Sequence, residues 1–145
     1  MAFTDYLEDA LLKHIFTSTG YTSPNASIYV ALLTAAPTDA STGATMTEVA
    51  SAHSYSRVQV TNWTVTGTAP TQVYNTNEIA FPTAGGSWGT ISHIGVLDSG
   101  THGAGNLLAY TNLSDPNDSN TAVTKVISNG DIFRILAQKL SIRLD

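Results

Sequence analysis

The sequence contains no cysteine and no long apolar run, and each absence excludes a class of protein. Without cysteine there can be neither a disulfide framework nor a thiolate metal site, which fits folding in a reducing cytoplasm. No segment approaches the roughly 20 consecutive apolar residues that a membrane-spanning helix requires. We therefore expect no membrane partner.

Charge is scarce as well, because charged residues make up 12% of the chain and the formal net charge is −5. The basic residues form no cluster, so we expect no nucleic-acid partner. Asp5, Glu8 and Asp9 stand where a secretory signal peptide would be basic, so we expect no secretion by that route. A surface rich in small polar residues but poor in charge suits a protein that packs against copies of itself or of a partner.

The region from Phe81 to Tyr110 is predicted to form the central hairpin of a β-fold. Residues 87–97 place apolar side chains on both alternating faces, which predicts a strand that is covered on both sides. Gly89 and Gly95 interrupt this strand, as glycines do at a bulge or where another segment packs very close. Leu107–Tyr110 is the predicted return strand.

Other short patterns predict strands that are separated by turn signals. Asn129-Gly130 predicts a tight hairpin, Ser114–Asn120 a turn, and Thr64–Thr76 a short edge strand. The count reaches seven to nine strands, which is typical of an all-β, antiparallel β-sandwich or jelly roll. We expect a single domain over residues 1–145, with the sandwich over about residues 27–145. The remaining predicted strands are Ile28–Leu33, Tyr55–Trp63, Glu78–Phe81, Ala122–Ile127 and Ile132–Leu144, the last with a break near Ala137.

One N-terminal α-helix is predicted over about residues 4–16. Leu7, Leu11 and Ile15 recur every four residues and form an apolar stripe. Asp5 and Glu8 predict a capping-box-like start. The stripe has to be buried either on the domain's own sheet or on a partner, and the sequence leaves both alternatives open.

Motifs that could carry chemistry are weak. The segment GGSWG at residues 85–89 matches the G-x-S-x-G nucleophile elbow, but a β pattern follows Ser87 where the elbow needs a helix. No histidine pair has a metal-binding spacing; we expect His93 to be structural and His102 to be solvated. Asp115–Asn120 alternates oxygen side chains but lacks the glycine and glutamate of an EF-hand loop. The sequence therefore predicts no catalytic, cofactor-binding or metal-ligating residue.

Five segments together resemble a family of small virion proteins of tailed bacteriophages, labelled tail-fibre or minor structural proteins. The resemblance covers most of the chain, and some members are similar to jelly-roll capsid cement (decoration) proteins. It implies a non-enzymatic, multi-copy protein without a cofactor, made in the host bacterial cytoplasm and located in the virion. The segments are MAFTDYLEDALLKHIF, IYVALLTAAPTDA, YSRVQVTNW, FPTAGGSWGTISHIGVLD and GNLLAYTNL.

The resemblance implies that the first hypothesis for function is a cement protein on the outer capsid surface. Such a protein binds only the assembled lattice of the major capsid protein and so lowers its free energy. A homodimer or homotrimer is expected, because a capsid offers local two-fold and three-fold positions. The contact surface is predicted on the helix and on a long, flexible loop over residues 40–52. The interface candidates are Phe3, Leu7, Leu11, Ile15, Thr45 and Met46.

Two alternatives stand beside the cement hypothesis. The first is a fibre, neck or tail component of the virion, which the same resemblance implies. The second, from a different class, is a carbohydrate-binding module, since jelly rolls often bind sugars. In that case Trp63, Trp88 and Tyr110 would form a stacking platform, although a sandwich core needs its aromatic residues too.

Overall fold

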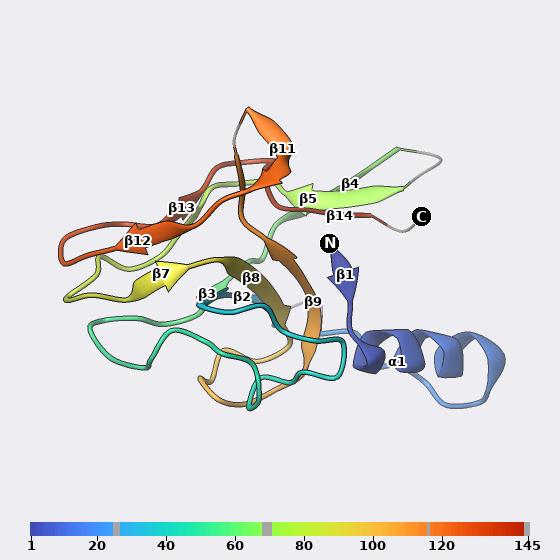
Figure 1. Cartoon of the computed structure of the whole chain (residues 1–145). Coiled ribbons are helices and arrows are strands. Elements are labelled where there is room, and N and C mark those ends of the chain that lie inside the picture. Colours follow the sequence, from blue (N-terminus) through green and yellow to red (C-terminus); the bar gives the residue numbers. More distant parts are fainter. Residues whose placement is uncertain (25–26, 68–70, 116, 144–145) are drawn as a thin grey trace.

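The largest element of the computed structural model is a five-stranded antiparallel sheet with strand order β1-β9-β8-β2-β3 (Figure 1). The structure describes residues 1–24, 27–67, 71–115 and 117–143. Strand β2 lies inside this sheet between β8 and β3, as its continuous apolar sequence predicts. The five strands are β1 (Ala2–Phe3), β9 (Leu107–Asn112), β8 (His93–Leu97), β2 (Tyr29–Leu33) and β3 (Val58–Gln59).

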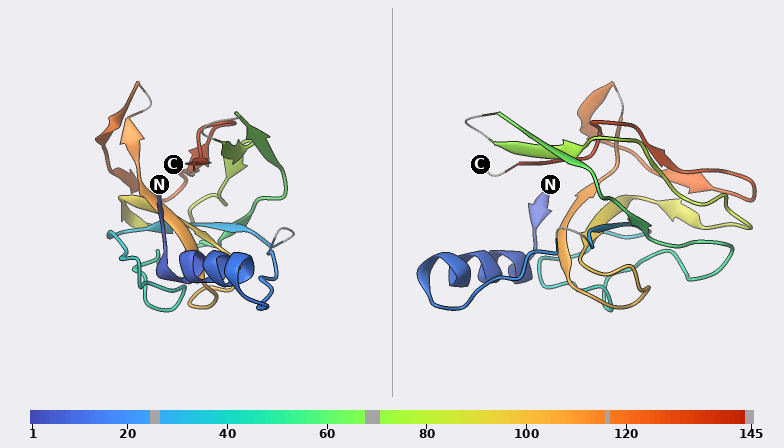
Figure 2. Two further views of the ribbon diagram at one scale, coloured as in Figure 1. Left: turned by 90° about the vertical axis from the view of Figure 1, so that its right-hand side faces the viewer. Right: turned by 180° about the vertical axis from the view of Figure 1, so that it is seen from behind.

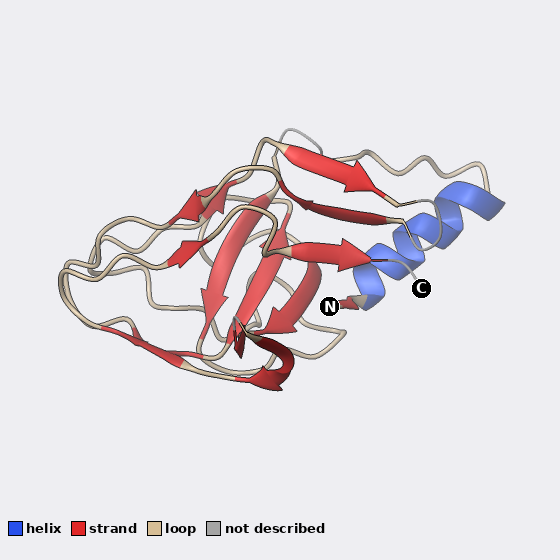
Figure 3. Ribbon diagram, turned by 90° about the horizontal axis from the view of Figure 1, so that it is seen from above, coloured by secondary structure: helices blue, strands red, loops and turns tan. Residues whose placement is uncertain are grey.

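A second layer of three short antiparallel sheets covers one face of this sheet (Figures 1 and 3). These sheets have the orders β12-β7, β13-β6 and β14-β5-β4, and a further hairpin pairs β10 with β11. The predicted all-β, antiparallel fold with one N-terminal helix is confirmed. The strands of the three small sheets and of the hairpin are β4 (Trp63–Thr66), β5 (Gln72–Asn75), β6 (Ile79–Ala80), β7 (Gly89–Ile91), β10 (Ser114–Asp115), β11 (Asp118–Ala122), β12 (Lys125–Ile127), β13 (Arg134–Ile135) and β14 (Ser141–Arg143).

The main hydrophobic core lies between the two layers. Val30 and Leu32 point into it from β2, while Ile94 and Val96 point into it from β8. Burial of these aliphatic side chains is the dominant favourable term for a sandwich of this kind. The second layer supplies the facing residues Ile79, Ile91, Ile127, Ile135 and Leu140.

A smaller core covers the other face of the five-stranded sheet. Ala31 and Leu33 alternate with the main-core residues of β2, and they pack with Leu97, Leu107 and Met46. Gly95 faces this region, where an added Cβ would lie 2.9 Å from a methyl carbon of Leu107. The central strands are therefore covered on both faces, as the apolar residues at both parities of residues 87–97 predict.

The hairpin predictions meet two corrections. Residues 87–97 do not form one strand, because the strand conformation is interrupted at Ser92. On one side of Ser92, β7 pairs with β12, and on the other side β8 pairs with β2 and β9. Asn129-Gly130 forms a turn, with Gly130 at φ 88° and Asp131 N–H donating to Ser128 O at 3.0 Å. The strands flanking this turn do not pair with each other, since β12 pairs with β7 and β13 with β6.

Three further predictions concern strand boundaries. Tyr55–Trp63 is not a single strand, because Val58–Gln59 form β3, which pairs with β2, whereas Trp63 begins β4, which pairs with β5. The segment Thr64–Thr76 contains most of β4 and all of β5. Most of the predicted turn Ser114–Asn120 instead belongs to the hairpin of β10 and β11. The predicted break near Ala137 is confirmed, since it separates β13 from β14 and Gln138 has a φ of 64°.

Helix α1 (Asp5–Phe16) projects away from the body of the molecule, in the same direction as the sheet β14-β5-β4 (Figures 1 and 2). No described helix is long and apolar enough to cross a bilayer. The helix begins directly after β1, so its position is fixed at one end by the pairing of β1 with β9.

Candidate functional site

Hydrogen bonds from Thr4 and Asp5 anchor the start of helix α1 to the body of the molecule. The Thr4 hydroxyl donates to the carbonyl of Leu107, and Thr4 N–H donates to Leu108 O at 3.1 Å. Asp5 N–H donates to Asp39 O at 3.0 Å. Thr4 is the N-cap residue but its side chain makes no capping bond, so the predicted capping box does not form. The anchor thus bonds the helix to β9 and to the loop that carries Asp39.

The apolar stripe of α1 is not buried in the chain. None of the twelve helical residues is buried, and exposure increases toward the C-terminal end. Leu7 and Leu11 are partly covered, whereas Ile15 is 66% exposed and Phe16 is 77% exposed. Phe3, just before the helix, is partly covered within β1. Of the two alternatives for the stripe, packing on the domain's own sheet is therefore limited to the first turns.

The long loop over residues 40–52, a predicted contact surface, packs in part against the body of the molecule. Met46 is 8% exposed and belongs to the smaller core, so its side chain is not available to a partner. Thr45 is exposed, and its hydroxyl accepts a hydrogen bond from Thr42 N–H at 2.9 Å. Gly43 approaches Ala104 so closely that an added Cβ would lie 2.1 Å from the Ala104 carbonyl oxygen. The loop therefore packs against a second loop.

A buried ion pair fixes these two loops, and sequence reasoning missed it. Arg57 is 6% exposed, and its Nε and Nη2 donate to the two carboxylate oxygens of Glu48 at 2.9 and 2.8 Å. Its Nη1 also donates to the carbonyls of Ser99 and Ala104, each at 2.8 Å. The Tyr55 hydroxyl donates to Glu48 at 2.9 Å, and burial together with the Glu48 charge raises the pKa of Tyr55. No sequence signal distinguishes Arg57 from a solvent-facing residue of an alternating strand.

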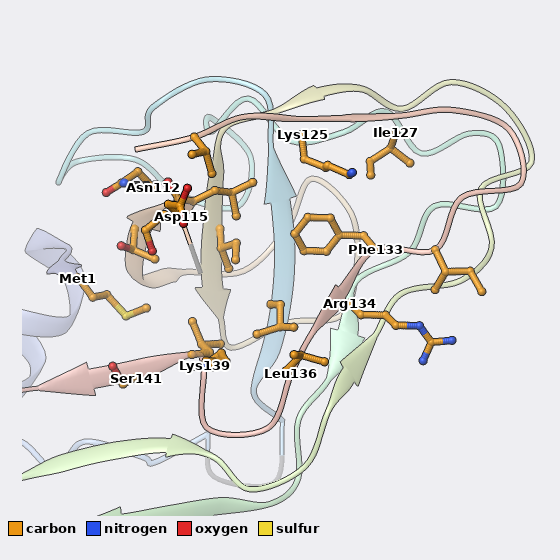
Figure 4. Close-up of a pocket in the computed structure, with 18 of the residues that line it drawn as sticks. Met1, Asn112, Asp115, Lys125, Ile127, Phe133, Arg134, Leu136, Lys139 and Ser141 are labelled. Atoms are coloured by element: carbon orange, nitrogen blue, oxygen red, sulfur yellow. Dashed lines mark hydrogen bonds between the residues drawn. The ribbon is translucent and has the colours of Figure 1, made fainter. Parts of the chain in front are cut away.

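A pocket of about 790 Å³ opens at the edge of the sandwich beside β9 (Figure 4). Its walls come from β8 to β10 and β12 on one side and from residues 131–141 on the other. Ile132 and Leu136 line it although they are 42% and 57% exposed, and Met1 reaches it from the N-terminus. Lys125 and Lys139 also line it. The pocket thus combines apolar walls with charged groups of both signs, since Arg134, Asp115 and Asp131 line it as well.

The motifs with possible chemistry have structural roles. Ser87 precedes β7, so a strand stands where a nucleophile elbow needs a helix. His93 bonds to the Ser92 hydroxyl at 2.9 Å, and burial lowers the pKa of His93. His102 is not merely solvated, because its Nε2 lies 2.9 Å from Val49 O and 3.7 Å from Glu48. The described residues contain no group of three potential metal ligands.

The predicted sugar-stacking platform is not assembled. Trp88 is 5% exposed, packs edge-on against Tyr55, and donates from its indole N–H to His53 O at 2.9 Å. Trp63 lies in β4 of the second layer, whereas Tyr110 lies in β9 and its hydroxyl donates to Asp39 at 2.7 Å. The hydrogen bond to Asp39 raises the pKa of Tyr110. A buried Trp88 cannot stack on a bound sugar.

Comparison with protein-family models matches residues 2–143 to a family described as "Podophage GP4 fiber I protein gp80". The chain belongs to this fiber I family. No curated protein matches the chain. The fiber I family is one of phage virion structural proteins and is not an enzyme family. Membership therefore makes the chain a structural protein of the virion, as the resemblance implies.

For a member of the fiber I family, the surfaces of interest are those that bind other virion proteins. Among the residues that the structure describes, α1 and the pocket beside β9 are apolar surfaces that lie open. Sequence reasoning identified the first from its periodicity. It missed the second because the pocket combines residues from Met1 to Ser141, which no local pattern connects.

Proposed function

We propose that this chain is a structural subunit of a virion fibre, held in the particle by non-covalent contacts. The family description, which names a fibre protein, supports this assignment over a capsid location. The exposed apolar residues Leu12, Ile15 and Phe16 of α1 support a role in assembly, because a soluble monomer gains nothing from uncovered apolar side chains. Repetition of weak contacts between many copies gives a stable assembly without any single strong contact.

The cement hypothesis makes a different claim about location, and one experiment decides between the two. Fab fragments raised against the purified chain, labelled with gold, are bound to intact particles and imaged by electron microscopy. The fibre proposal expects label on fibres that project from the particle. Label distributed over the capsid surface in many symmetric copies would contradict the fibre proposal and favour a cement protein. A cryo-electron microscopy reconstruction of the same particles then gives the position of α1.

A further inference from the structure

We infer that α1 of one copy of this chain binds in the pocket beside β9 of a second copy. The inference concerns self-association, so it holds or fails independently of where on the virion the chain is located. It identifies the partner of α1 as a second copy rather than a different protein. Three observations carry it: the distribution of exposed apolar side chains, the position of the pocket, and the distribution of unpaired charges.

Exposed apolar side chains gather at two places. Of the nine large apolar residues exposed in the described part of the chain, four belong to α1 and three line the pocket. The remaining two, Val65 and Val126, belong to neither surface. Two separate apolar surfaces on one chain are both removed from water if they cover each other. The helical residues are Tyr6, Leu12, Ile15 and Phe16, and the pocket residues are Met1, Ile132 and Leu136.

The helix does not cover the pocket of its own chain. No residue of α1 lines it. The helix projects beyond the body of the molecule (Figures 1 and 2). Pairing of β1 with β9 and the bonds of Thr4 fix the start of the helix. The contact between helix and pocket therefore has to form between two copies.

The charges of the two surfaces are complementary. Within the helix, Asp9 pairs with Lys13 at 2.7 Å, while Asp5 and Glu8 make no ion pair among the described residues. In the described part of the pocket, Lys125 and Lys139 likewise make no ion pair. The pocket lining also includes Arg134, which pairs with Glu78, and the carboxylates of Asp115 and Asp131, which accept hydrogen bonds from the backbone N–H groups of Asn117 and Ser128. Three basic and two acidic residues thus line the pocket, whereas the helix has three acidic residues and one lysine. The excess charges of the two surfaces are opposite in sign, which favours their association.

The pocket is of a size to receive side chains of the helix. A helix of twelve residues is about 18 Å long, and Leu12, Ile15 and Phe16, at spacings of three and four, lie along one side of it. The pocket volume of about 790 Å³ accommodates several such side chains but not a folded domain. Because Met1 of the pocket is only a few residues from α1, two copies related by a two-fold axis could exchange helices within one interface. Reciprocal exchange doubles the buried surface toward the roughly 1,200–2,000 Å² of a stable interface.

The first test is the molar mass of the purified chain, measured by sedimentation and light scattering over a concentration series. We expect an oligomer that I15S/F16S or K125E/K139E dissociates, with at least about a tenfold weaker association for each variant. The matched controls V65S and V126S also remove exposed apolar side chains, yet should leave association unchanged. The inference would be overturned if the chain stays monomeric at about 1 mM, or if both double variants associate as strongly as the unchanged chain.

Charge reversal provides a test that loss of folding cannot imitate. The variant D5K/E8K should fail to associate with itself but should associate with K125E/K139E when the two are mixed. Recovery in the mixture requires both variants to be folded and requires the helix to meet the pocket in trans. Absence of recovery, with both variants folded by circular dichroism, would count against the inference.

Because the chain has no cysteine, single cysteines report the contact directly. One copy carries I15C and the other carries L136C, and the mixture is oxidised. A disulfide between the two kinds of copy is expected well above the level given by the control pair V65C and L136C. Equal yields for the two pairs would show that α1 lies elsewhere and would overturn the inference.

Discussion

The five-stranded sheet and helix α1 both contain apolar residues, but the sheet buries these residues and the helix leaves most of them exposed. In β2, the four residues Val30–Leu33 are all completely buried, because the sheet is covered on both faces. In α1, no residue is buried, and Ile15 and Phe16 are mostly exposed. An apolar pattern in the sequence indicates only that one face of a helix or strand should be covered. Whether the same chain or another chain covers that face depends on where the helix or strand lies in the fold.

The largest expected effect comes from breaking the buried pair on the sheet side. Arg57→Ala leaves the Glu48 carboxylate buried without its partner, so we expect a loss of about 3–5 kcal/mol in the free energy of unfolding. Arg134→Ala is the matched control: it breaks an exposed pair with Glu78 and should cost less than about 1 kcal/mol. Urea denaturation followed by tryptophan fluorescence measures both.

A double variant shows whether the cost of Arg57→Ala arises from the stranded charge. Replacing both partners, as in Arg57→Met with Glu48→Leu, removes the pair without leaving a buried charge, and should recover part of the lost stability. If the double variant is as unstable as Arg57→Ala, the loops depend on the hydrogen bonds of Arg57 to Ser99 and Ala104 instead.

The next effect separates two neighbouring residues of the long loop. Met46→Ala creates a cavity in the smaller core and should cost about 2–5 kcal/mol. Thr45→Ala changes an exposed residue and should cost no more than about 0.5 kcal/mol. Thermal unfolding by circular dichroism compares the two. Equal costs would show that the loop does not form part of the core.

A smaller effect concerns pH and the central sheet. Burial lowers the pKa of His93 in the folded state, so the unfolded chain binds this proton more readily. The contribution of neutral His93 is present above the unfolded pKa of about 6.5 and is lost as the pH falls toward the lower folded value. The free energy of unfolding should therefore decline over that range, and less steeply in His93→Gln. Equal slopes for both proteins would assign the acid sensitivity to other groups.

The smallest effect on stability is expected at the helix. Ile15→Ser together with Phe16→Ser removes two mostly exposed side chains, so the free energy of unfolding of the monomer should change by less than about 0.5 kcal/mol per residue. Unfolding at concentrations below association measures this. Deleting residues 1–16 is not an equivalent test, because it also removes β1 and the buried Thr4. A large loss in the double variant would mean that α1 belongs to the core.

The elements that the sequence predicts are those whose partners are close or whose pattern is unambiguous. Strand β2 and helix α1 follow from a continuous apolar run and from four-residue periodicity. The break at Ser92 was missed because both halves have β character and only the choice of partner strand separates them. Asn129-Gly130 predicts the turn but not which strands pair, since pairing depends on contacts distant in sequence.

Of the two candidate surfaces, only the apolar face of α1 was predictable from the sequence. The stripe of α1 is visible in the sequence, whereas the pocket collects residues from both termini and from β8 to β14. Arg57 shows a related limit: Val58 and Val60 suggested that its alternating neighbour faces solvent, but the loops from Gly43 and Ser99 cover it. Tertiary coverage of this kind leaves no trace in a local pattern.

The absence of buried residues in α1 has a consequence for how this protein can diverge. A buried position is constrained by the packing of its neighbours, so nearly every substitution there lowers the stability of the fold. An exposed position such as Ile15 or Phe16 is free of that constraint, whereas Leu7 and Leu11 are partly covered. If α1 binds a partner as proposed, selection acts on the exposed positions through that contact. If α1 binds the pocket as inferred, new combinations of helix and pocket residues arise by a few substitutions, each leaving the two-layered body intact.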